Sequence, residues 1–146
     1  MAKNADMSLD GSEYPQLMHT ALDTTDARWL AEFYRELLGL RYRPGDEPAA
    51  DGVDDDADWL VLVDADGARK LAFQQVEELK QATWPEPEVP MQLHIDYRVP
   101  SVSELERHLQ RAEALGARLL YDRSESEEPL YVLADPAGHP FCLLVG

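Results

Sequence analysis

The two halves of this chain follow the same plan, and this internal repeat constrains the fold more than any other feature. In each half a histidine lies in a short β-compatible stretch, a helical pattern follows, and a glycine ends it. Each half closes with a strand pair around an Asp-x-x-Gly turn. The matched positions are His19 and His94, Leu30 and Leu105, Gly39 and Gly116, and the turns 64–67 and 135–138.

Apolar spacing predicts the order β-α-β-β-β in each half. A helix is expected where apolar residues recur three and four positions apart after capping residues, as they do after 24–26 and after 101–103. Strands are predicted at 15–23, 40–43, 59–63, 70–76, 92–99, 118–122, 130–134 and 140–145. The predicted domains are a flexible tail at 1–14, a first module at 15–84, a proline-rich linker at 85–90 and a second module at 91–146.

Composition limits the classes of partner. The 146 residues are 45% hydrophobic, which is enough to form a core, and the formal net charge is −16. Such a charge disfavours nucleic acid and anionic membranes, since both repel an acidic surface. It suits a soluble protein and would attract a cationic ligand. The single cysteine excludes an intrachain disulfide, and no apolar stretch suggests a signal peptide or a membrane helix, so we expect a cytoplasmic protein.

Several segments resemble one protein superfamily. They are LMHTALDTTD and FYRELLGL in the first half, and LHIDYRVPSVSELE and ADPAGHPFCLLVG in the second. Together with the repeat, they resemble the vicinal oxygen chelate superfamily, which includes glyoxalase I, bleomycin-resistance proteins, extradiol dioxygenases and fosfomycin-resistance enzymes. The resemblance implies an α+β fold in which two βαβββ modules in tandem form a half-open curved sheet around a cleft. It also implies a homodimer.

The superfamily's metal-using members take one ligand from each of four strands. Strand alternation maps these positions onto His19, Gln74, His94 and Cys142, so the resemblance implies a possible site for zinc, nickel, iron or manganese. The two histidines match the glyoxalase pattern, whereas an amide and a thiol stand where that pattern has carboxylates. Gln74 cannot act as a base, because an amide does not titrate. Cys142 could be a thiolate ligand or a small buried residue, and the histidines could face the cleft without a metal.

Further residues are candidates for contact with a ligand. Parity places Asp23, Asp96 and Arg98 on the same inward faces as the two histidines. Asp96 follows His94 by two residues, roughly 7 Å along the strand, which favours a role beside the site. Trp59 and Trp84 could contact a ligand, Trp84 as a lid, although core packing is the common role of a tryptophan.

Two functions compete as interpretations of these residues. The first is a glyoxalase- or bleomycin-resistance-like protein that binds a small organic molecule in the inter-module cleft without a complete metal site. The alternative is a divalent-metal-dependent lyase, isomerase or dioxygenase that uses His19 and His94. An accessory subunit without chemistry is a third idea, and the sequence identifies no catalytic residue.

Overall fold

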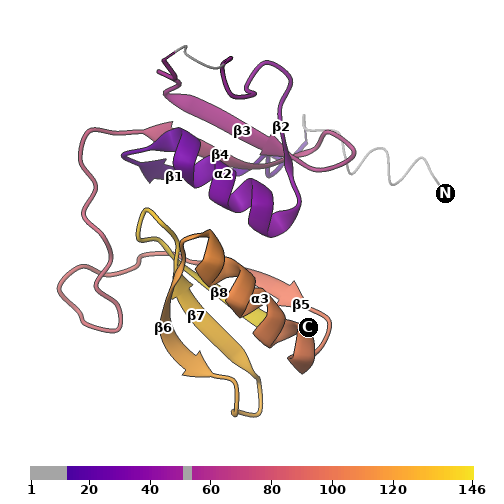
Figure 1. Ribbon diagram of the computed structural model, residues 1–146, viewed down its shortest axis with the longest axis vertical. Coiled ribbons are helices and arrows are strands. Elements are labelled where there is room, and N and C mark those ends of the chain that lie inside the picture. Colours follow the sequence, from indigo (N-terminus) through magenta and orange to yellow (C-terminus); the bar gives the residue numbers. More distant parts are fainter. Residues whose placement is uncertain (1–12, 51–53) are drawn as a thin grey trace.

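The computed structural model describes residues 13–50 and 54–146, and these form two modules of one helix and one four-stranded sheet each (Figure 1). The predicted tail lies outside the described residues up to position 12, as do residues 51–53 of the loop before the third strand. This arrangement confirms the α+β class and the two βαβββ modules.

The first module contains β1 (Thr20–Thr24), α2 (Ala27–Leu38), β2 (Arg41–Tyr42), β3 (Trp59–Val63) and β4 (Arg69–Gln75), in the sheet order β1-β4-β3-β2. Local chemistry sets the bounds of its helix. The Asp26 side chain accepts a hydrogen bond from the Trp29 backbone N–H and caps the first turn. Gly39 ends the helix with φ at 68°, a left-handed conformation that glycine adopts without steric cost.

The second module contains β5 (Ile95–Val99), α3 (Val102–Leu115), β6 (Arg118–Arg123), β7 (Leu130–Ala134) and β8 (Pro140–Val145), in the sheet order β5-β8-β7-β6. Ser101 caps α3 by accepting from the Glu104 backbone N–H, and Gly116 ends it. The sequence predicts both the N-terminal cap and the glycine that ends this helix.

The two modules share strand register as well as element order. In the first, Thr20 pairs with Leu71 across the parallel strands β1 and β4; in the second, Ile95 pairs with Phe141 across β5 and β8. One position further along, Ala21 pairs with Ala72 and Asp96 pairs with Cys142. Ala72 is therefore the register counterpart of Cys142. Both β1 and β5 are edge strands.

A single hydrophobic core joins the modules. It contains residues from both helices and from the helix-facing side of both sheets. At its centre is Tyr34 of α2, whose ring contacts Phe73 of its own module and both Tyr97 and Phe141 of the other. The Tyr34 hydroxyl donates to the buried Asp135 carboxylate at 2.6 Å. The modules therefore pack through their helices, and the sheet faces away from the helices are left for other uses.

A long connection links the modules. It runs from β4 to β5 along one side of the molecule (left in Figure 1), and residues 76–94 contain no helix or strand. In the part of the chain that the structure describes, neither helix is long and apolar enough to span a membrane.

Candidate functional site

A pocket of about 310 Å³ lies between the two modules. The first module contributes residues of β1 and α2, the second contributes the starts of β5 and β8, and the connection covers one side. Its lining residues are Ala21, Leu22, Asp23, Tyr34, Leu79, Met91, Gln92, Leu93, Ile95, His139, Pro140 and Phe141. Most of these side chains are apolar, and few polar groups stand at the edge, which is the composition of a small-molecule site.

A hydrogen bond between His139 and Asp23 connects the two modules at the polar edge of this pocket. Nε2 of His139 donates to the backbone carbonyl of Asp23 at 2.6 Å, so this ring nitrogen carries a proton. No hydrogen bond or ion pair to the Asp23 carboxylate occurs among the described residues. This carboxylate is therefore available to a ligand. The position of His139, directly after the 135–138 turn, predicts a residue of the turn or of the cleft rim, and its partner Asp23 lies 116 positions away in the sequence.

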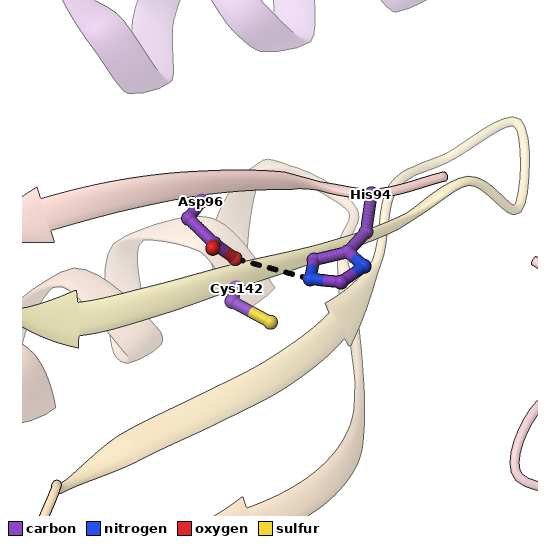
Figure 2. Close-up of side chains that lie close together, drawn as sticks. All are labelled: His94, Asp96 and Cys142. Atoms are coloured by element: carbon purple, nitrogen blue, oxygen red, sulfur yellow. Dashed lines mark ion pairs between the residues drawn. The ribbon is translucent and has the colours of Figure 1, made fainter. Parts of the chain in front are cut away.

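A second group of chemically capable side chains lies on the face of the second sheet away from the helices. His94, Asp96 and Cys142 place their ligand atoms within 4.8 Å of one another (Figure 2). Nε2 of His94 is 3.3 Å from a carboxylate oxygen of Asp96. His94 and Asp96 are exposed, whereas Cys142 is buried beneath them.

The Cys142 thiol is held in its protonated form. Burial raises its pKa to about 11, and the neighbouring Asp96 carboxylate, which accepts the thiol hydrogen, acts in the same direction. An ordinary thiol attacks electrophiles as thiolate, so Cys142 is a poor nucleophile at neutral pH.

His19 does not belong to this group. Its ring lies 5.8 Å from that of Trp59 on the first module, and its buried Nδ1 has no hydrogen-bond partner. Burial lowers the pKa of His19, and the positive charges of Arg69 and Arg43 lower it further. Gln74 is exposed and pairs with Asp23 across β1 and β4. The structure thus groups two of the four implied ligands, His94 and Cys142, and adds Asp96 to them.

The remaining sequence candidates lie apart from the pocket. Arg98 is exposed on β5, and Trp84 of the connection packs edge-on against Tyr121 of β6 with ring centroids 6.1 Å apart. Trp59 flanks His19 on the first sheet. Of the five candidates for ligand contact, Asp23 alone lines the inter-module pocket.

The two βαβββ modules with open sheets are consistent with the vicinal oxygen chelate fold. A comparison with protein families matches residues 19–144 to the glyoxalase-like domain. The chain belongs to this family. No curated protein matches the sequence significantly.

Solved structures with similar folds agree with this assignment. The fosfomycin resistance protein FosX from Mesorhizobium loti is 18% identical with a TM-score of 0.61, and the match covers 90% of this chain and 92% of that chain. A glyoxalase/bleomycin resistance protein/dioxygenase family enzyme from Burkholderia phytofirmans PsJN is 15% identical with a TM-score of 0.60, covering 88% and 96%. A mutant of FosX from Listeria monocytogenes, complexed with Mn(II) and 1S,2S-dihydroxypropylphosphonic acid, is 17% identical with a TM-score of 0.62, covering 90% of each chain.

The donors on the second sheet can be tested against the metal that the fold implies. An imidazole, a carboxylate and a thiol suit a borderline ion such as zinc. The two-histidine and carboxylate set of the glyoxalase pattern is not assembled here, since His19 lies elsewhere. A metal at this group would have to displace the Cys142 thiol proton, which is hydrogen-bonded to Asp96.

Proposed function

We propose that this protein binds a small, largely apolar organic molecule in the pocket between its two modules. The observation that carries the proposal is the pocket itself, whose volume of about 310 Å³ lies at the lower end of the usual range of small-molecule sites. Both modules and the connection build it, so a ligand there would be held by the whole chain. The proposed site needs no metal.

The polar groups at the edge of the pocket would orient the ligand. The apolar walls are formed by residues such as Leu93 and Phe141, which would surround the body of the molecule. The Asp23 carboxylate and the Gln92 amide would meet its polar group. An amino group would suit the Asp23 carboxylate best, because it would supply the positive charge that no Lys or Arg supplies among the described residues lining the pocket.

A pocket-filling variant tests the proposal. The neutral fluorescent probe N-phenyl-1-naphthylamine brightens when it enters an apolar site, and we expect saturable binding to the native protein. Ala21→Trp places a large ring at the pocket wall and should weaken probe binding at least tenfold. Ala65→Trp is the matched control, because Ala65 is exposed in the turn between β3 and β4. Equal binding by both variants would contradict the proposal, provided that their melting temperatures match the native protein.

The group of His94, Asp96 and Cys142 favours a second candidate function, a divalent-metal-dependent lyase, isomerase or dioxygenase. These residues would hold the ion, and a bound metal would polarise a substrate oxygen. The Mn(II) in the FosX complex from Listeria monocytogenes supports the idea by analogy of fold. A homodimer, which the family resemblance implies, is one way in which a second copy could bring His19 to the group.

Cobalt titration separates the two candidates. A Co(II)–thiolate complex gives a charge-transfer absorption that reports Cys142 directly. Under the metal hypothesis, Asp96→Asn should weaken cobalt binding roughly tenfold or more, while the control Asp122→Asn, an exposed aspartate on β6, should not. Loss of binding in His19→Ala would show that the ligand set includes His19. Absence of the absorption in the native protein would remove the second candidate and leave the first standing.

A further inference from the structure

The connection that covers the inter-module pocket is bonded to the two modules only at its ends. At one end the Val76 backbone N–H donates to the Thr24 carbonyl, and at the other end β5 begins at Ile95. We call residues 77–93 the strap. Among the residues that the structure describes, every hydrogen bond of the strap stays within it, and it forms no ion pair. A segment held in this way can detach locally while the modules stay folded.

The tip of the strap has a fixed shape of its own. The Thr83 backbone N–H donates to the Val89 carbonyl at 2.8 Å, and the Val89 N–H donates to the Thr83 hydroxyl at 2.8 Å. The Glu86 N–H donates to the Thr83 carbonyl inside this loop. These bonds close residues 83–89 into a compact loop, so the tip can move as one unit about the limbs that carry it.

The strap spans open space between its contacts with the second module. A cavity of about 340 Å³ lies between its two limbs, residues 79–82 and 89–92, and residues 137–140 of the second module. Gln81 packs closely against Gly138, and the Trp84 ring packs edge-on against Tyr121. The cavity adjoins the inter-module pocket, because both are lined by Leu79, Met91, Gln92, His139 and Pro140.

A strained turn lies where the strap leads into β5. Gln92 has φ at 59°, and it is the one non-glycine residue with a positive φ in the described part of the chain. The Leu93 backbone N–H donates to the Met91 carbonyl at 2.6 Å, which closes a three-residue γ-turn around Gln92. A γ-turn with a positive central φ is rare and strained, and an L side chain raises its cost. All three residues of this turn line the pocket.

We propose that the strap is a lid over the inter-module pocket and that the γ-turn at Gln92 is its hinge. The strained turn belongs to the closed lid, in which Met91, Gln92 and Leu93 form part of the pocket wall. Opening relieves the strain, so a ligand can enter and leave without unfolding of either module. This inference rests on the proposed function for its ligand, whereas the opening of the lid needs no ligand.

Two substitutions at one position isolate the backbone strain. Gln92→Ala and Gln92→Gly both remove the amide side chain, but glycine alone adopts a positive φ without steric cost. The closed lid should therefore be more stable in Gln92→Gly than in Gln92→Ala. Gln92→Pro fixes φ near −65° and forbids the turn, so its lid should stay open. Equal melting temperatures of the three variants would show that the modules remain folded.

Trypsin measures lid opening without any ligand. Lys80 is the single lysine or arginine of the strap, and cleavage after it in the native protein follows the population of the open form. Cleavage after Lys80 should be about three- to fivefold slower in Gln92→Gly than in Gln92→Ala, and at least tenfold faster in Gln92→Pro. Cleavage after Arg123, which is exposed at the end of β6, should not change. Equal rates after Lys80 in the glycine and alanine variants would overturn the proposal.

Dissociation of N-phenyl-1-naphthylamine tests the link between lid and pocket. In stopped-flow experiments the probe should leave Gln92→Gly about three- to fivefold more slowly than Gln92→Ala, and fastest from Gln92→Pro. Equal dissociation rates, beside different cleavage rates, would overturn the assignment of the strap as a lid over this pocket. A native protein that binds no probe would contradict the proposed function, while cleavage rates in the expected order would still support the hinge at Gln92.

Discussion

The two modules have the same topology and register, yet the sheet faces that point away from their helices have different chemistry. At the register position where the first sheet has Ala72, the second has Cys142; where the first has Ala21, the second has Asp96. The first face is apolar and edged with arginines of β2 and β4, and the second has a thiol, a carboxylate and an imidazole. The helix-facing positions, by contrast, are mostly apolar in both modules. The repeat therefore preserves the packing that both halves share and varies the sheet faces that point away from the helices.

The strongest test of this comparison uses the aspartate that starts the Asp-x-x-Gly turn in each module. Asp135 accepts hydrogen bonds from the backbone N–H groups of Ala137 and His139 and from the buried Tyr34 hydroxyl. Asp64 accepts the two turn hydrogen bonds but lies nearer the surface. We expect Asp135→Ala to cost about 3 kcal/mol, because it strands a buried hydroxyl, and Asp64→Ala about 1 kcal/mol or less. Urea unfolding of both variants measures the difference. Equal losses of unfolding free energy would show that the hydrogen bond between Tyr34 and Asp135 adds no stability beyond the hydrogen bonds of the turn.

The second prediction concerns the Cys142 thiol, which distinguishes the face of the second sheet that points away from the helices. Since Asp96 helps to raise the pKa of Cys142 to about 11, Asp96→Asn should lower this pKa and speed alkylation by iodoacetamide at pH 8, by roughly tenfold. The chain has one cysteine, so the rate against pH reports this residue alone. Asp23→Asn is the control on the other module. An unchanged pH profile in Asp96→Asn would mean that burial alone holds the proton.

The third prediction compares the glycines of the two turns. Gly67 has φ at 85°, and a Cβ added to it would meet no atom within 4 Å. Gly138 has φ at 97°, and a Cβ there would lie 2.6 Å from Cγ of Gln81. Alanine at either position should cost about 1 kcal/mol through the left-handed backbone, and Gly138→Ala should cost more, because the Gln81 side chain must move. Urea unfolding measures both costs. Adding Gln81→Ala should remove the excess, and failure to do so would locate the added cost elsewhere.

The smallest effect on stability is expected from His19 and His94, the histidines at matched positions of the two halves. Burial, together with Arg69 and Arg43, lowers the pKa of His19 below the ordinary value of 6.5, so the unfolded chain binds this proton more tightly than the folded one. The contribution of His19 to stability should therefore be present above pH 6.5 and decline as the pH falls through that value towards the lowered folded pKa. His19→Gln should flatten the fall in melting temperature between pH 7 and pH 5, measured beside His94→Gln as the matched variant. A steeper fall in the melting temperature of His19→Gln would contradict a lowered pKa of His19 in the folded protein.

The fold follows from the sequence to a large extent because its signals are local and occur twice. The caps at Asp26 and Ser101 and the glycines after each helix are visible within a few residues. The strands follow from alternation of apolar side chains. Two halves that predict the same elements support each other, and the structure confirms them.

The candidate site is less accessible to such reasoning, because its contacts are not local. Alternation places His94 and Asp96 on one face, but their 3.3 Å approach depends on the orientation of a histidine just before β5 begins. The pairing of Asp96 with Cys142 follows from strand register, which spacing alone does not fix. The pocket edge needs His139 to reach the Asp23 carbonyl in the other module. The net charge of −16 also conceals the arginine-edged face of the first sheet.

The contact between the helices has a consequence for each half of the chain taken alone. Arg111 of α3 donates to the carbonyls of Glu36 and Leu37 at the end of α2, and Tyr34 packs among aromatic rings of both modules. A lone module would expose this apolar helix face to water, so neither half should be stable without the other. Separate polypeptides for the two halves, made together, should still reassemble.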